Sequence, residues 1–150
     1  ERLAFIRGHL PMVTRITLHI TSSGGDIYPA FAAYDYLKAY PLPVDGVVMG
    51  YVASAAAMIL LQACTVRKAY PSARLLIHEA RRTGFIYNER TTDAEDDIKE
   101  LRLVQDHSLA VMAERMHRPP EEVKKLLERR ELWLGAEEAL ALGLIDEIIR

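Results

Sequence analysis

Cysteine, long apolar runs and basic clusters are all scarce in this sequence, and each scarcity excludes a class of protein. The single cysteine, Cys64, cannot form an internal disulfide, which is typical of a reducing compartment and predicts a cytoplasmic protein. The longest apolar run, around residues 53–61, is far shorter than the ~20 residues that a membrane-spanning helix needs, so we expect no membrane partner. The formal net charge is −2 and no basic run is present, so we expect no nucleic-acid partner.

Metal-binding motifs are also missing. The five histidines form no HExxH pattern and the sequence contains no CxxC pair, which argues against a zinc site. We therefore predict that the protein uses neither a metal nor a cofactor. What the sequence does contain is apolar material: half of its 150 residues are hydrophobic, enough to fill the core of one domain that spans residues 1–150.

Strand-like and helix-like segments alternate along the chain. Helices are predicted at residues 27–39, 54–64 (small, apolar and therefore buried), 92–116, from Pro120 onward, and 136–142 before Gly143. Strands are predicted at residues 3–6, 16–20, 44–49 (ended by Gly50), 75–77 and 132–134. This alternation predicts an α/β fold with largely parallel strands.

The first two predicted strands lie unusually close together. Parallel neighbours need a connection of about a dozen residues or more, and only a few residues, around 8–14, separate the strands at 3–6 and 16–20. Either these strands are not parallel neighbours, or a connecting segment is missing between about residues 10 and 11.

A double glycine follows the strand at 16–20, at the point where the next helix begins. In the stretch Ser23-Gly24-Gly25-Asp26, residues without Cβ let the backbone turn sharply and leave N–H groups facing outward. At a helix N-terminus such groups favour negative charge, so Gly25 could supply half of an oxyanion hole. The alternative is an ordinary tight turn.

Ser54 lies at a second junction between a strand and a helix. The N–H group of Ala55 could face the same point as that of Gly25, so the pair could bind one oxyanion. The alternative is that Ser54 only caps the helix, because serine is a favoured N-cap residue.

His78 ends the apolar strand at 75–77, where the active sites of α/β proteins gather. The alternative is a hydrogen-bonded core histidine. A serine needs a base to become a nucleophile near neutral pH, and histidine is the usual one. Serine, histidine and N–H donors at the ends of core strands together predict acyl-transfer chemistry. A third group should orient the imidazole, and spacing alone leaves four candidates: Glu79, Asp93, Glu128 and Glu131.

Four segments together resemble one family. ITSSGGDIYPAFAAYDYL resembles I-N-S-P-G-G-x-x-x-x-G-x-x-I-Y-D, and GYVASAAAMIL resembles the serine segment G-x-A-A-S-x-x-x-x-L. ARLLIHEA resembles the histidine segment S-R-x-M-I-H-Q-P, and ELWLGAEEALALGLID resembles D-R-x-x-x-A-x-E-A-x-x-Y-G-L-I-D. In order and with nearly the family's spacing, they are similar to the Clp-type proteolytic subunits, which are self-compartmentalised serine peptidases.

The resemblance implies a role for each site residue. Ser54 would be the nucleophile, His78 the base, and the N–H groups of Gly25 and Ala55 the oxyanion hole. Glu131 takes the position of the family's triad aspartate, and a glutamate there resembles the phage head-maturation branch. The implied activity is serine endopeptidase cleavage of polypeptides inside an oligomeric chamber.

The resemblance also implies an architecture and partners. The fold would be ClpP/crotonase-like, with repeated ββα units and a protruding handle helix at 92–116 that joins homo-oligomeric rings. The family's helix between the first two strands is absent here, and residues 81–85 take the place of its substrate-pairing strand. Thr17 and His19 replace the aromatic residues that dock an unfolding ATPase, so that partnership stays open.

Two other functions remain as alternatives. A crotonase-like acyl-CoA enzyme would share the fold and the backbone oxyanion donors, but it needs no pair like Ser54 and His78. A catalytically silent ring subunit would only shape an assembly, although such subunits typically lose the serine or the histidine.

Overall fold

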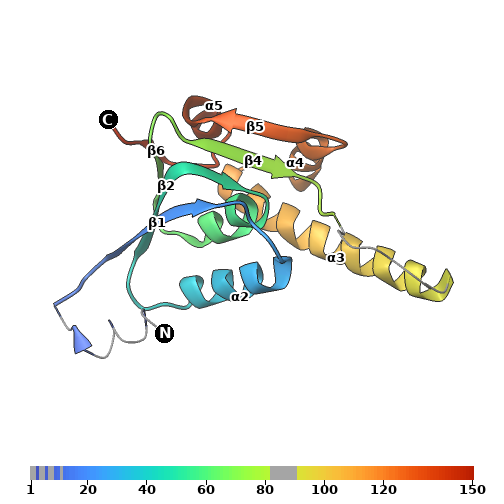
Figure 1. Cartoon of the computed structure of the whole chain (residues 1–150), viewed down its shortest axis with the longest axis horizontal. Helices are drawn as coiled ribbons and strands as arrows, with labels where there is room; N and C mark the ends of the chain where they lie inside the picture. Colours follow the sequence, from blue (N-terminus) through green and yellow to red (C-terminus); the bar gives the residue numbers. More distant parts are fainter. Residues whose placement is uncertain (1–2, 4–5, 7–8, 11, 82–90) are drawn as a thin grey trace.

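The computed structural model describes residues 3, 6, 9, 10, 12–81 and 91–150 of the chain. The described strands form one twisted sheet, and the long helix α3 (Thr91–Met116) extends well beyond it at one side of the molecule (Figure 1). Of the predicted substrate-pairing segment at 81–85, only Arg81 lies within the described residues.

The sheet is largely parallel, as the sequence predicts. Its strands are β1 (Ile16–Ser22), β2 (Val44–Ala53), β3 (Arg67–Ala69), β4 (Arg74–His78), β5 (Glu131–Gly135) and β6 (Glu147–Ile148). β2 is the centre: β1 pairs with one of its sides, and β3 and β4 pair end to end along the other. Only β5, next to β4, runs antiparallel to its neighbour among the described strands.

The remaining helices follow the sequence prediction closely. They are α2 (Ile27–Lys38), α4 (Pro120–Leu127) and α5 (Ala136–Ala141). The predicted buried helix at 54–64 is buried but is not a regular α-helix. It consists of a π-helical turn, η1 (Ala56–Leu60), and a 3₁₀ turn, η2 (Leu61–Ala63). Tertiary packing inside the core has replaced the regular i→i−4 pattern there.

The predicted strand at 3–6 is wrong at its described positions. Leu3 and Ile6 are helical, and the N–H of Leu10 donates to the carbonyl of Ile6 across 3.0 Å. Leu3 and Ile6 are spaced as on one helix face, and both pack against the small apolar cluster around Ile16. The connection between residues 6 and 16 therefore does not have to join two parallel strands, and its shortness needs no explanation. A missing segment between about residues 10 and 11 stays a prediction.

Gly50 bends β2 but does not end it, which corrects the predicted boundary at 44–49. Its φ is +69°, and the register of β1 against β2 shifts between Ile20 and Ser22, which is the signature of a bulge. Beyond the bend, β2 continues to Ala53 and pairs with β4. This continuation carries Ser54 to the end of β4, close to His78.

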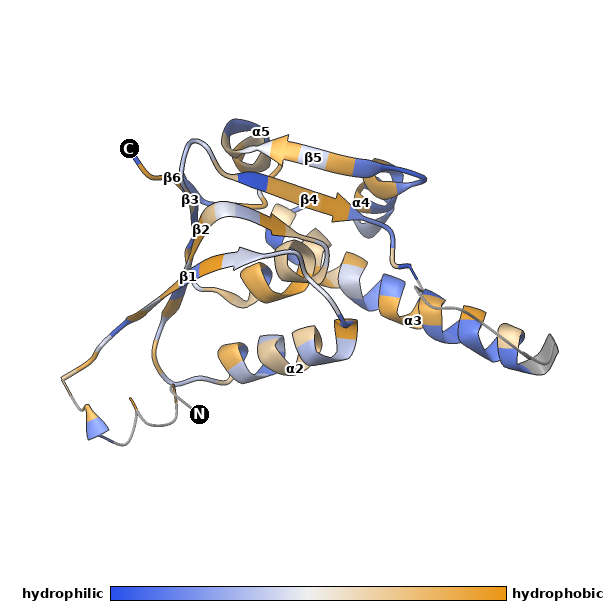
Figure 2. Cartoon of the chain, viewed as in Figure 1, coloured by the Kyte–Doolittle hydropathy of each residue, from blue (hydrophilic) through white to orange (hydrophobic). Residues whose placement is uncertain are grey.

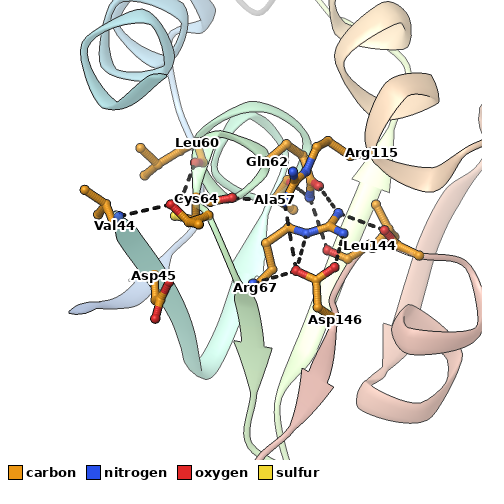
Figure 3. A network of polar contacts seen from close by, with 12 residues as sticks. Val44, Asp45, Ala57, Leu60, Gln62, Cys64, Arg67, Arg115, Leu144 and Asp146 are labelled. Carbon is orange, nitrogen blue, oxygen red and sulfur yellow. Dashed lines mark hydrogen bonds and ion pairs between the residues drawn. The ribbon is translucent and has the colours of Figure 1, made fainter. Parts of the chain in front are cut away.

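A buried polar network fixes the chain's C-terminal part to the sheet. Arg67 is 3% exposed, and its Nε donates to Asp146 Oδ2 at 3.0 Å while its Nη1 donates to Gln62 Oε1 at 2.7 Å (Figure 3). The backbone N–H of Arg67 also donates to Asp146, at 2.7 Å. Burial by itself would raise the pKa of Asp146, but the hydrogen bonds and charge of Arg67 outweigh it and lower the pKa.

Apolar residues are concentrated in the interior of the molecule. β4 is apolar over most of its length, as Figure 2 shows, and Leu75 and Ile77 are fully buried. On the part of α3 that projects from the body, hydrophobic and hydrophilic residues are interspersed (Figure 2), and Ile98 and Leu103 are about half exposed. Within the described part of the chain, no helix has the length and apolar character needed to cross a membrane.

Candidate active site

The double-glycine turn is pressed against the end of β2. Gly24 has φ +85°, and a Cβ there would lie 2.5 Å from the carbonyl oxygen of Ala53 and 2.8 Å from Ser54 Cβ. Only glycine fits this contact, since real Cβ atoms do not approach so closely. Asp26 then caps α2, with Oδ1 accepting from the N–H of Tyr28 at 3.0 Å. The turn at Gly24 and Gly25 therefore brings the start of α2 beside Ser54.

Ser54 occupies a strained position between β2 and η1. Its φ is +55°, in the left-handed region that non-glycine residues rarely adopt and that often marks functional sites. Its N–H donates to the carbonyl of Leu76 at 2.9 Å, and its own carbonyl accepts from Met58 at 2.9 Å. The helix that follows has Ala55 as its N-cap residue and no side-chain capping bond. Ser54 thus begins this turn through its backbone carbonyl, and capping by its side chain stays a prediction.

His78 ends β4 and is 9% exposed, with its ring facing the same space as Ser54. Its Nδ1 contacts the carbonyl oxygen of Glu79. Because a carbonyl oxygen can only accept, Nδ1 carries the proton in this contact, and in the neutral ring Nε2 is left as the acceptor. This is the tautomer that a general base needs in order to receive a hydroxyl proton through Nε2.

One cavity of about 730 Å³ unites four of the five predicted site residues. Gly25, Ser54, Ala55 and His78 all line it. Its apolar surface comes from η1, β4 and α3, and includes Met58, Leu76, Leu101 and Val104. Gly25 and His78, which are 53 positions apart in sequence, thus face one space of a size that suits a small ligand or a peptide side chain.

Glu131 is the predicted site residue that stays outside this cavity. It lies directly opposite His78 in the ladder between β4 and β5. Its Oε1 is bound by Arg81 Nη1 at 2.6 Å, and both side chains are about half exposed. Within the described part of the chain, no hydrogen bond or ion pair joins Glu131 to His78. The strand register thus places Glu131 beside His78, but the carboxylate of Glu131 binds Arg81.

The three rival acids have other positions. Glu79 Oε2 accepts from the backbone N–H of Arg129 at 3.2 Å, which directs it toward the loop before β5. Glu128 follows α4 as its C-cap residue and is exposed. Asp93 lies in the first turn of α3. None of these three occupies the cross-strand position opposite His78 that Glu131 holds.

Three contacts around the cavity were not found by sequence reasoning. Gln105 Oε1 accepts from the N–H of Ala80 and so ties α3 to the segment after His78. The hydroxyl of Tyr28 donates to Glu100, which joins α2 to α3 across the cavity. Arg81 lines the cavity and binds Glu131. Each links residues far apart in the chain, and no local pattern signals such a contact.

The comparisons with known proteins agree on one family. A model of the family described as Clp protease matches residues 10–150. The chain belongs to the Clp protease family. It is 32% identical over 135 residues to the ATP-dependent Clp protease proteolytic subunit 1 of Chlamydia muridarum, an overlap that covers 89% of this chain and 69% of that one. It is 30% identical to the ATP-dependent Clp protease proteolytic subunit of Deinococcus radiodurans, over 89% of this chain and 64% of that one.

The fold agrees as well. A solved structure of a ClpP1 mutant from Listeria monocytogenes superposes with a TM-score of 0.84 and 25% identity, over 99% of this chain and 80% of that one. The predicted ClpP-like α/β fold and the predicted family are therefore confirmed. Three of the four quoted segments supply Gly25, Ser54, Ala55 and His78, which line the cavity, and α3 supplies further lining residues such as Leu101 and Val104.

Proposed function

We propose that this chain is a serine endopeptidase subunit, with Ser54 as the nucleophile and His78 as the general base. The observation that carries the proposal is the shared cavity, which Gly25, Ser54, Ala55 and His78 all line. Membership of the Clp protease family supports peptidase activity independently. The substrate would be a polypeptide.

The proposed reaction gives each of these groups one role. Ser54 Oγ attacks the carbonyl carbon of the peptide bond, and His78 Nε2 takes the hydroxyl proton. The N–H groups of Gly25 and Ala55 donate to the oxyanion of the tetrahedral intermediate. His78 then returns the proton to the departing amide nitrogen, which leaves an ester on Ser54. Water, activated by the same histidine, hydrolyses that ester and restores the enzyme.

We further propose Glu131 as the acid that orients His78 during turnover. Directly opposed residues of an antiparallel pair lie on the same face with Cβ atoms about 4.5–5.5 Å apart, and Glu131 is opposite His78. A carboxylate that accepts from Nδ1 would hold the tautomer described above and stabilise the imidazolium that forms.

A homo-oligomeric ring assembly would complete the chamber. Ile98 and Leu103 of α3 are about half exposed, so this helix has apolar surface left for a second subunit. The named relatives are ATP-dependent Clp protease subunits, so an ATPase partner is a further part of the proposal for this chain, to be tested separately.

A silent ring subunit is the second candidate, because one observation favours it. In this structure the acceptor on His78 Nδ1 is the carbonyl of Glu79 and not an acid. The crotonase-like alternative has less support, since it gives no role to the strained backbone of Ser54 or to the position of His78.

Covalent labelling tests the proposal. A fluorophosphonate probe should react with the wild-type protein, and peptide mapping should place the adduct on Ser54. Ser54→Ala should abolish labelling, whereas Ser23→Ala, a matched change at another serine that lines the same cavity, should leave the adduct on Ser54. An unlabelled wild-type protein would favour the silent subunit, and an adduct on another residue would refute Ser54 as the nucleophile.

A further inference from the structure

Two residues, His78 and Arg81, lie within reach of the carboxylate of Glu131. The strand register places His78 directly opposite it, within the reach of a cross-strand pair. The carboxylate nevertheless binds Arg81, three residues further along from His78, with 2.6 Å between Nη1 and Oε1. His78 Nδ1 meanwhile contacts the carbonyl of its own neighbour, Glu79. Glu131 and His78 are therefore neighbours across the two strands, but each forms its hydrogen bond with a different residue.

The segment that carries Arg81 is itself fixed at its base. The N–H of Ala80 donates to Gln105 of α3, and the side chain of Glu79 accepts from the backbone of Arg129. The backbone between His78 and Arg81 is thus held from two sides. A change of partner for Glu131 therefore needs the side chains of Arg81, Glu131 and His78 to rotate, without a shift of this backbone segment.

The ion pair is weak enough to exchange. The side chains of Arg81 and Glu131 are 54% and 50% exposed, and pairs so open to water contribute little because solvent screens them and both chains lose rotamer freedom. Arg81 also lines the cavity that contains Ser54 and His78. A ligand that enters the cavity therefore meets part of the Arg81 side chain, whose Nη1 binds Glu131.

We propose that Arg81 is a positioning residue that withholds Glu131 from His78 in the arrangement described above. The proposal rests on the proposed peptidase function and concerns how that site is regulated. A ligand that draws the guanidinium away releases the carboxylate, which then accepts from His78 Nδ1 in place of the Glu79 carbonyl. Arg81 takes no part in bond making: it acts only through Glu131.

A double-mutant cycle tests this role through the rate at which the fluorophosphonate probe labels Ser54. Arg81→Gln keeps a polar side chain but removes the charge, so it should raise the labelling rate about two- to fivefold, which corresponds to the strength of an exposed ion pair. In the Glu131→Gln background the same change should have no effect, because no carboxylate remains to be released. Arg81→Lys, which keeps the charge, should label like the wild type.

Two controls separate this role from a general effect of charge or fold. Arg130→Gln removes a cation next to Glu131 in sequence, at an exposed position, while the carboxylate keeps its bond to Arg81, and should leave the rate unchanged. Added salt should accelerate labelling of the wild type and not of Arg81→Gln, since only the wild type has the pair to screen.

The outcomes are distinct from those of the proposed function. If Ser54 of the wild type is not labelled, the peptidase proposal fails and this one with it. If Ser54 is labelled but Arg81→Gln lowers the rate, only the role of Arg81 is overturned. The same holds if Arg81→Gln raises the rate equally in the wild-type and Glu131→Gln backgrounds.

Discussion

At the scale of single residues, the site depends on backbone positions that few side chains tolerate. A Cβ at Gly24 would collide with the carbonyl of Ala53 and the side chain of Ser54, and Ser54 itself has a positive φ. The close approach of Gly24 and the strained backbone of Ser54 meet at the end of β2, beside the cavity. Strain of this kind persists only where the surrounding packing determines it.

Gly24→Ala should therefore impair both stability and labelling of Ser54. The new Cβ would meet the Ala53 carbonyl at 2.5 Å and would also require φ +85° of an alanine, so we expect a loss of about 2–4 kcal/mol in the free energy of unfolding. Urea unfolding measures it. Gly25→Ala is the matched control, since its Cβ would have no atom within 4 Å and only the strain of φ +148° remains. Equal losses in the two variants would contradict the close contact at Gly24.

Glu131→Gln tests the acid. If Glu131 orients His78 during turnover, its amide variant should lose up to about 10⁴-fold in turnover, the loss seen when a triad acid elsewhere becomes an amide. Glu131→Asp should keep part of the activity, and Glu79→Gln, whose side chain caps a loop, should stay near the wild type. Turnover of a peptide substrate by each variant decides this. A severe loss in Glu79→Gln with normal Glu131→Gln would show that the wrong acid was chosen.

At the scale of elements, sequence reasoning found most helices and strands because their apolar residues repeat at the correct spacing. It failed where tertiary contacts override local signals. Gly50 was interpreted as a strand end because glycine interrupts strands, but pairing with β4 continues β2 through a bulge. Leu3 and Ile6 were assigned to a strand although their spacing fits a helix that packs on the cluster around Ile16.

The candidate site was predictable to a similar degree. Gly25, Ser54, Ala55 and His78 could be found because each lies at the end of a core strand, and the ends of parallel strands converge. The partner of Glu131 could not be found, because Arg81 and Glu131 are 50 residues apart and meet only through the pairing of β4 with β5.

The element pair β3 and β6 offers a test of the buried network. Arg67→Met would leave Asp146, whose side chain is 38% exposed, without its main partner, and we expect a loss of about 1–3 kcal/mol in the free energy of unfolding, since hydrogen bonds to charged groups are worth about that much. Lys68→Met breaks the exposed Lys68–Glu147 pair between the same two strands and should cost about 1 kcal/mol or less. Denaturant unfolding of both variants at neutral pH gives the comparison.

The same network predicts a pH dependence. Burial raises the pKa of Asp146, but Arg67 more than compensates and the pKa lies below its usual value. A carboxyl group with a depressed pKa stabilises the fold above its unfolded pKa, and that contribution disappears as pH falls through the folded pKa. The difference in stability between the wild type and Arg67→Met should therefore shrink below about pH 4. A difference that stays constant down to about pH 2 would contradict the role of this ion pair.

At the scale of the whole molecule, α3 gives the chain its asymmetric shape (Figure 1). This helix has exposed apolar residues, Ile98 and Leu103, and assembly with other subunits would bury them. Leu103→Glu should shift the protein to smaller species without unfolding it, as measured by light scattering with circular dichroism. Tyr36→Glu, at an exposed aromatic residue of α2, is the control and should leave the size unchanged. A wild-type protein that is monomeric across micromolar concentrations would rule out ring assembly by this chain.

The central claim is that Ser54 cleaves polypeptides with His78 as its base. The most direct measurement is incubation of an unfolded polypeptide with the wild type and with Ser54→Ala, and identification of the fragments by mass spectrometry. The account predicts internal cleavage by the wild type and intact polypeptide with Ser54→Ala, at equal protein concentration and equal assembly state. Fragments produced at the same rate by both proteins would contradict it.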